Sequence, residues 1–121
     1  MSTRQDLINE IIGYRLLEED WDGEGAIKLK EECILEALQF LEEIPYEFPL
    51  PDVCADPNGK VLFYWNEEET GFRAYVDILG DGRIAYFMVE GDVRHKGITN
   101  MPGKKDGRDA DRKTKKKGKN S

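Results

Sequence analysis

The sequence is poor in the residues that build disulfide frameworks and zinc sites. Its 121 residues include two cysteines, Cys33 and Cys54, and a single histidine, His95. The cysteines lie far apart and form no C-x-x-C pair, which excludes a disulfide framework and a Cys/His zinc site. Each cysteine falls within an apolar pattern. We therefore expect both to be buried thiols that behave as small hydrophobic side chains.

Long hydrophobic runs are also absent. No apolar stretch approaches the roughly 20 residues that a membrane-spanning helix needs. The first six residues, Met1 to Asp6, lack the basic region followed by an apolar stretch that marks a secretory signal. We therefore expect a soluble protein of the cytoplasm that has no membrane partner.

Charge divides the chain into two parts. Residues 104–121 contain nine Lys or Arg and three Asp or Glu, a local charge of +6, whereas residues 1–103 contain nine and 22, a local charge of −13. The basic segment has almost no apolar surface to offset the entropy lost on ordering. The sequence therefore predicts one acidic domain over residues 1–103 and a basic, disordered tail over residues 104–121.

Helical periodicity occurs twice, near the N-terminus. Apolar residues recur at three- and four-residue spacing over residues 3–19 and again over residues 30–43. Thr3, with Asp6 three positions later, is placed to cap the first helix. Pro45 ends the second helix, because proline disfavours the helical conformation in the residue before it.

The middle and the end of the acidic domain are patterned as strands separated by turns. Gly, Asp and Asn cluster between short apolar or alternating runs. The expected strands are residues 53–55, 61–65, 72–78, 84–90 and 93–99, the last at an edge. The sequence therefore predicts an α+β fold in which two N-terminal helices pack on one face of a four- to five-stranded antiparallel meander.

One local pattern matches a calcium-binding loop. Asp20, Asp22, Glu24 and Glu31 occupy positions 1, 3, 5 and 12 of an EF-hand loop, and Gly25 occupies position 6. Carboxylate oxygens at these positions ligate calcium, and glycine permits the sharp turn. With a helix expected on each side, the loop resembles an EF-hand and gives one alternative function, calcium binding.

Other features of this segment favour a structural turn instead. Glu24 is longer than the Asp or Asn usual at its position, and Glu19 and Glu32 stand where EF-hand helices have apolar residues. EF-hands usually pair, yet the sequence has one such loop. The other interpretation is a polar turn between two helices with Trp21 packed beneath it and no cofactor.

Four segments within residues 5–90 occur in a recognisable order. They are Trp21-Asp22-Gly23-Glu24-Gly25-Ala26, Phe40-Leu41-Glu42-Glu43-Ile44-Pro45, Pro57-Asn58-Gly59-Lys60-Val61 and Tyr64-Trp65. With them the chain resembles a family of short bacterial proteins that carry a Trp-Asp-Gly-x-Gly-Ala motif and occur on plasmids, phages and other mobile regions. In that family the motif occurs without a complete set of calcium ligands, which implies a structural role. This chain departs from the pattern at Lys30-Glu31-Glu32, where the family has a Pro or Ser cap, and in its basic tail.

The sequence offers no catalytic set. His95 has no Ser or Cys near it along the chain, and a lone histidine on an edge strand is more often a surface residue. The glycine pairs at residues 23 and 25 and at residues 80 and 82 lack the strand–turn–helix order of a phosphate loop. We therefore expect no catalytic residue and a protein that is not an enzyme.

Three surfaces remain as binding candidates. The acidic ridge of the second helix and the strand over residues 72–78 are expected to meet a protein partner through Glu32, Glu36, Glu43, Arg73, Tyr75 and Asp77. An acidic body without a catalytic set favours a protein-interaction module that binds a basic partner, such as an inhibitor, an antitoxin or an accessory factor of a mobile element. A further alternative is nucleic-acid binding through phosphate contacts of the tail residues Lys113, Lys115, Lys116, Lys117 and Lys119.

Overall fold

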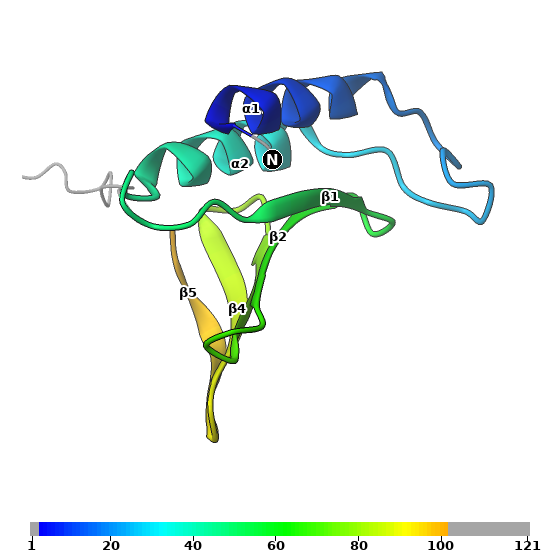
Figure 1. Cartoon of the computed structure of the whole chain (residues 1–121). Helices are drawn as coiled ribbons and strands as arrows, with labels where there is room; N and C mark the ends of the chain where they lie inside the picture. Colours follow the sequence, from blue (N-terminus) through cyan, green and yellow to red (C-terminus); the bar gives the residue numbers. More distant parts are fainter. Residues whose placement is uncertain (1–2, 102–121) are drawn as a thin grey trace, which may run out of the picture.

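The computed structural model describes residues 3–101 as two helices followed by five strands (Figure 1). The elements are α1 (Arg4–Gly13), the 3-10 turn η1 (Tyr14–Leu16), α2 (Glu31–Glu43), β1 (Asp52–Asp56), β2 (Lys60–Glu67), β3 (Phe72–Ile78), β4 (Arg83–Glu90) and β5 (Val93–Asn100). The α+β class is confirmed. None of the helices in the described range has the length and apolar character to cross a membrane.

The five strands form one antiparallel sheet in the order β1-β2-β3-β4-β5. Each strand pairs with the strand before it because short turns join all of them. Gly59 and Gly80 lie in two of these turns with φ values of +84° and +88°, a conformation that other residues adopt at a cost. The predicted meander is therefore confirmed with five strands, and β5 is an edge strand as expected.

Helix α1 begins as predicted but ends early. The Thr3 hydroxyl accepts a hydrogen bond from the Asp6 N–H at 3.1 Å, and the Asp6 carboxylate accepts one from the Thr3 N–H at 2.9 Å. The expectation of a helix to residue 19 is wrong, because the chain turns into η1 after Gly13. Glycine costs about 1 kcal/mol relative to alanine in a helix. Beyond Gly13 the apolar period does not mark a helix face, because Leu16 is 81% exposed while the next residue, Leu17, packs against the core.

One hydrophobic core contains residues from both helices and from the sheet. Phe40 of α2 meets Phe63 of β2 with ring centroids 5.1 Å apart. The buried Cys33 thiol lies 3.6 Å from the Ile78 carbonyl oxygen, as expected of a thiol packed among apolar side chains. Cys54, which was also expected to be buried, is only half-buried, because it lies on the sheet face opposite Phe63.

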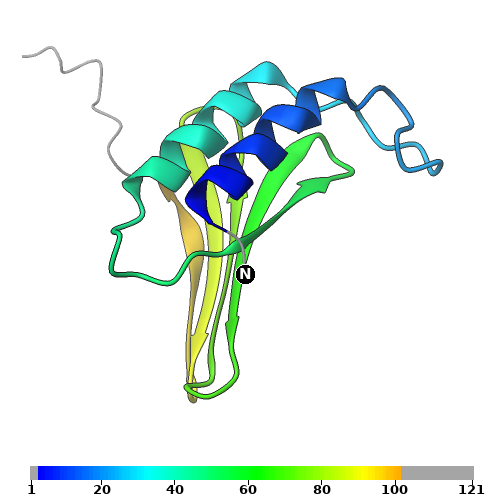
Figure 2. The same cartoon turned by 45° about the horizontal axis from the view of Figure 1, so that its top comes forward.

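The helices lie across one end of the sheet (Figures 1 and 2). The β2–β3 and β4–β5 hairpins project away from them, so the far half of the sheet extends beyond the helical layer. We call the sheet face that carries Phe63 and Ile78 the inner face and the opposite face the outer face. Along this far half, the inner-face side chains have no helix above them.

Candidate interaction groove

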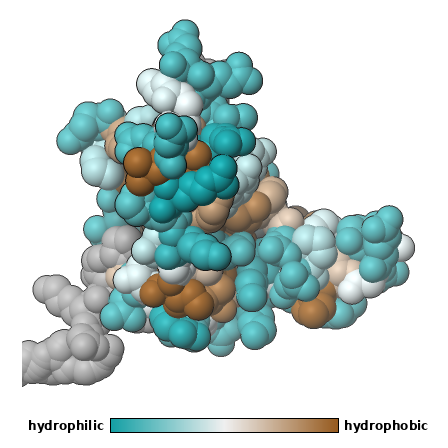
Figure 3. All heavy atoms as spheres, turned by 90° about the horizontal axis from the view of Figure 1, so that it is seen from below, coloured by the Kyte–Doolittle hydropathy of each residue, from teal (hydrophilic) through white to brown (hydrophobic). Residues whose placement is uncertain are grey.

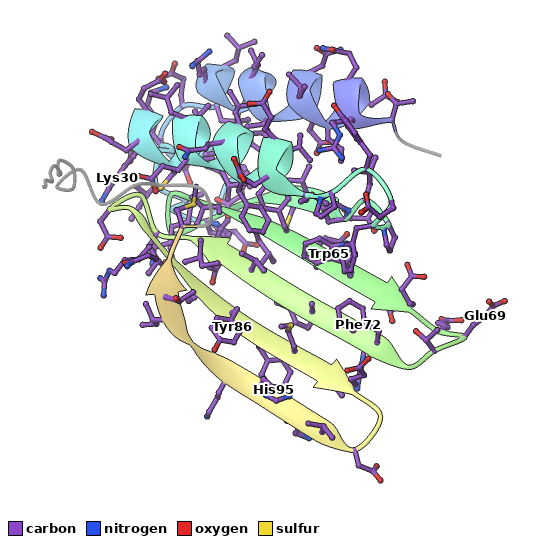
Figure 4. All side chains as sticks on the ribbon, turned by 90° about the vertical axis from the view of Figure 1, so that its left-hand side faces the viewer. Lys30, Trp65, Glu69, Phe72, Tyr86 and His95 are labelled. Atoms are coloured by element: carbon purple, nitrogen blue, oxygen red, sulfur yellow. The ribbon has the colours of Figure 1, made fainter. Side chains whose placement is uncertain are left out.

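The uncovered part of the inner face carries a row of apolar side chains. In the strand register, Trp65 lies opposite Ala74, Ala74 opposite Met88, and Met88 opposite His95. Figure 4 shows four side chains on this face of the sheet, from just below the helices to well beyond them: Trp65, Phe72, Tyr86 and His95. Four adjacent strands therefore contribute to one continuous surface.

These side chains line an open groove of about 570 Å³. Its floor and walls are formed by Phe48, Trp65, Phe72, Ala74, Val76, Ile84, Tyr86, Met88, His95 and Thr99. Tyr86 and Met88 are half-buried, whereas His95 and Thr99 of β5 are exposed. Viewed from below, the molecular surface shows hydrophobic patches among mostly hydrophilic side chains (Figure 3).

The loop after α2 supplies one wall of the groove. The indole N–H of Trp65 donates a hydrogen bond to the Pro49 carbonyl at 2.8 Å, which ties this loop to β2. Phe48 then meets Trp65 and Phe72 edge-on, with ring centroids 6.2 and 6.5 Å away. Such edge-to-face pairs are favourable aromatic geometries. Phe48 is nevertheless 44% exposed, so much of its ring remains available for contact.

A smaller hollow of about 290 Å³ continues the groove towards α2. It shares Phe48 and Trp65 with the groove and adds Phe40, Glu43, Ile44 and Pro45. The apolar surface therefore runs from the end of α2 to the edge of β5.

The chemistry of the lining suits binding better than proton transfer. Among the groove residues, His95 has the one imidazole side chain, and no cysteine or carboxylate lines the groove beside it. A histidine acting as a base needs a partner that orients it or accepts charge from it. The described groove residues around His95 provide the hydroxyls of Tyr86 and Thr99 and apolar side chains instead, and no hydrogen bond from His95 to either hydroxyl is formed.

The three predicted binding residues of β3 lie together on the outer face. Tyr75 sits in a row of aromatic rings between Tyr64 and Phe87, at centroid distances of 6.5 and 6.4 Å. Asp77 is half-buried, and its Oδ1 has no hydrogen-bond partner within residues 3–101. Burial raises the pKa of the Asp77 carboxyl, the charge of Asp56 raises it further, and Lys60 opposes both. Arg73 is exposed at the other end of this face.

The predicted acidic ridge of α2 is a separate surface, because α2 packs on the inner face. Glu32 and Glu43 are exposed, as a binding ridge requires. Glu36 is half-buried and accepts a hydrogen bond from the Gly82 N–H at 3.1 Å, so it also joins α2 to the β3–β4 turn. The structure therefore does not bring the six predicted partner-binding residues together on one surface.

Three of the four carboxylates of the predicted calcium loop, those of Asp20, Asp22 and Glu31, are engaged in the protein's own contacts, and Glu24 is exposed. The Asp20 carboxylate accepts from the Gly25 N–H at 2.6 Å, and that of Asp22 accepts from the N–H groups of Glu24 and Ala26 at 2.8 and 3.1 Å. Glu31 forms a 2.6 Å ion pair with Arg15. The guanidinium holds the pKa of the Glu31 carboxyl below its usual value.

The surroundings of this loop also differ from an EF-hand. The expected helix on its N-terminal side is missing, because α1 ends at Gly13 and η1 at Leu16. Trp21 is half-buried, and its indole N–H donates to the Ile27 carbonyl at 3.2 Å. Across residues 3–101, no group of three or more His, Cys, Asp or Glu side chains is arranged to hold a metal ion.

Sequence reasoning missed the groove, although it identified the strands that form it. Alternation along β3 and β4 predicts that Ala74, Val76 and Tyr86 share a face, but it does not say how far along that face a helix extends. Phe48 carries no signal, because it lies in a loop between two prolines. The five lysines predicted to contact phosphate fall outside the described residues.

The contacts within residues 3–101 do not bear on the prediction that the acidic faces bind a partner, or on the resemblance to the Trp-Asp-Gly proteins. The resemblance stays a prediction, because no family model, no curated protein and no solved structure matches this chain.

Proposed function

We propose that this chain is a protein-interaction module and not an enzyme, and that its partner binds in the inner-face groove. The observation that carries the proposal is the extension of an aromatic and aliphatic sheet face beyond the helices that cover its other end. Exposed contiguous apolar patches on soluble proteins commonly mark binding sites.

The residue types in the groove support this function. Aromatic side chains and methionine are enriched at the centres of protein interfaces, where a few of them contribute most of the binding energy. Phe48, Tyr86 and Met88 each keep part of their side chain exposed. Burying that surface stabilises a complex by about 25 cal/mol per Å² before the costs of association are subtracted.

The groove replaces the acidic ridge as the favoured contact surface. Glu36 and Glu31 of the ridge already make intramolecular contacts with Gly82 and Arg15. A groove also offers shape as well as charge, and shape is what distinguishes one partner from another. A role as an inhibitor, an antitoxin or an accessory factor is compatible with such a module and stays a prediction.

A selection experiment with matched variants tests the groove. A displayed peptide library is selected on the full chain, and each binder is then tested against Met88→Glu and Leu35→Glu. Met88 lines the groove, whereas Leu35 is 52% exposed on α2 and does not line it. Both substitutions place a carboxylate at an accessible apolar site, so they match in chemistry and differ in location.

We expect binders to lose at least tenfold in affinity against Met88→Glu and to keep it against Leu35→Glu. Circular dichroism and thermal melting establish that both variants are folded. Binders that ignore Met88→Glu, or that depend on Leu35, would place the interaction elsewhere and remove the support for the groove.

A further inference from the structure

Strand β5 leaves one edge of the sheet open. It is the last strand in the sheet order, and within residues 3–101 it has a strand neighbour on the β4 side alone. In an antiparallel ladder about half of the backbone N–H and C=O groups of such a strand point outward. Every residue of β5 is exposed apart from the half-buried Gly97. The edge is therefore accessible to another extended chain.

The two faces of β5 differ in charge. His95 lies opposite Met88 and therefore on the inner face, which places Arg94 and Lys96 on the outer face. Neither cation pairs with a carboxylate among the described residues, and β5 contains no acidic residue. The neighbouring outer-face positions of β4 are Arg83, Ala85, Phe87 and Val89. The edge of an otherwise acidic domain is thus basic on one face.

The inner face of the edge continues the groove. Gly97 lies opposite Tyr86, and a Cβ atom at Gly97 would be 3.0 Å from the Tyr86 hydroxyl oxygen. The Tyr86 side chain therefore extends across β5 in the space that a side chain at this position would fill. A strand added beyond β5 would meet Tyr86 and His95 with its inner-face residues.

The same charges argue against a second copy as the occupant. Antiparallel pairing of β5 with itself keeps the outer faces on the same side, and the register centred on Lys96 places the two Lys96 side chains opposite each other. In other registers, β5 has no acidic residue to meet Arg94 or Lys96. Like charges directly opposite each other destabilise a strand pair, and opposite charges stabilise it. The edge therefore disfavours self-pairing and favours a strand with negative charge.

We infer that β5 pairs with an extended acidic segment of a protein partner, added as a sixth strand with acidic side chains on the outer face and apolar ones on the inner face. This inference rests on the proposed function, because the apolar positions are those that reach the groove. Glu67 and Glu90 lie at the far end of the inner face, opposite Phe72 on either side. Glu90 also lies opposite Val93 of β5, and the inner face beside it is the mostly apolar groove, so acidic residues of the partner belong at the outer-face positions. The alternation is therefore part of the inference.

Two peptides of identical composition provide the probes. One is the acetylated and amidated peptide Glu-Val-Glu-Phe-Glu-Val-Glu, and the other is Glu-Glu-Val-Phe-Val-Glu-Glu. Both carry the same charge and the same apolar residues, but only the first alternates with the period of a strand. Fluorescence anisotropy gives the affinity of the full chain for each, and amide hydrogen exchange measured by NMR reports protection along β5.

Two charge-matched double substitutions locate the binding. Arg94→Glu with Lys96→Glu reverses the charge of the β5 edge, whereas Lys28→Glu with Lys30→Glu changes the net charge equally in the segment just before α2, away from β5. We expect the alternating peptide to bind about tenfold more tightly than the other peptide and to protect the β5 amides from exchange. Its affinity should fall about tenfold for the Arg94→Glu, Lys96→Glu variant and stay unchanged for the control variant. The Met88→Glu variant is measured in parallel.

The outcomes separate the edge from the groove. Equal affinity for the two peptides, equal loss in both double variants, or no binding at all would overturn the edge inference. If affinity then falls in Met88→Glu alone, the groove proposal survives without the edge. Binding that needs Arg94 and Lys96 and protects β5, yet ignores Met88→Glu, supports the edge and overturns the groove.

Discussion

The Trp65 indole N–H donates to the Pro49 carbonyl at 2.8 Å, and this bond holds the loop that places Phe48 over the groove. Trp65→Phe keeps an aromatic ring and removes the donor. We expect the free energy of unfolding to fall by about 1 kcal/mol, because the Pro49 carbonyl loses its partner. Urea denaturation measures this change.

Trp21→Phe serves as the control for that substitution. Its indole N–H also donates to a backbone carbonyl, that of Ile27, but the bond is longer, at 3.2 Å, and lies in an exposed loop. We expect a smaller loss there. A Trp65→Phe protein as stable as the wild type would show that the loop is held by packing and not by this bond.

The pH dependence of stability is predicted to involve Asp77. Its pKa is raised above the ordinary 3.8 by burial and by Asp56, so the native state holds this proton more tightly than the unfolded state. Stability therefore falls as pH rises from 3.8 through the raised pKa. Asp77→Asn should be more stable than the wild type at pH 7, and the gain should vanish as pH falls below that window.

Denaturation of Asp77→Asn at pH 7 and in acid, with Asp92→Asn as the exposed control, checks this sign. Asparagine keeps an unpaired polar oxygen at the site, so the comparison isolates the charge. A gain that persists unchanged in acid would point to a cause other than ionisation.

The turn between β3 and β4 depends on glycine for two separable reasons. At Gly80 φ is +88°, and an added Cβ would lie 2.7 Å from the Cys33 Sγ. Gly71, in the turn between β2 and β3, serves for comparison: its φ is +74°, and nothing lies within 4 Å of the added atom. We expect Gly71→Ala to cost about 1–2 kcal/mol through backbone strain alone.

Gly80→Ala should cost about 1 kcal/mol more than Gly71→Ala, since overpacking adds to the strain. Combining Gly80→Ala with Cys33→Ala gives a double-mutant cycle that recovers the packing part. Equal losses at the two glycines, with no coupling to Cys33, would contradict the close approach. Thermal or urea denaturation provides the measurement.

The Asp20–Glu31 loop is predicted to depend on hydrogen bonds more than on metal. Asp22→Ala removes the acceptor for two N–H groups and should lower stability by about 1 kcal/mol, whereas Asp22→Asn keeps an acceptor and should cost less. Calorimetric titration should give no saturable calcium binding. Micromolar binding that disappears in an Asp20→Ala, Glu31→Ala double variant would restore the calcium function.

The sequence predicts secondary structure correctly where a single local signal, such as apolar alternation or a turn glycine, determines it. Alternation of Phe72, Ala74, Val76 and Ile78 with polar residues fixes the faces of β3, and glycines at obligatory turns fix its ends. The first helix was overextended, because Leu16 and Leu17 continue the apolar period after Gly13 has ended the helix. Periodicity records which residues are apolar and not which of them become buried.

The groove was not readable from the sequence, because it depends on how far the helices extend over the sheet. Nothing in a strand's own sequence distinguishes an apolar residue under a helix, such as Phe63, from one beyond it, such as Met88. The contact of Phe48 with Trp65 joins a loop to a strand through tertiary structure alone. The ion pair of Arg15 with Glu31 could not be predicted either, because tertiary structure alone brings the two residues together.

The overhang of the sheet has a consequence for its motions. Near the helices, strands β1 to β4 contribute residues to the shared core, but towards the β2–β3 and β4–β5 hairpins no described helix covers the sheet and the strands are held mainly by their neighbours. Local opening begins where few buried contacts oppose it. The free end of the sheet should therefore exchange its amide hydrogens first. A partner bound there would reduce local opening and slow this exchange.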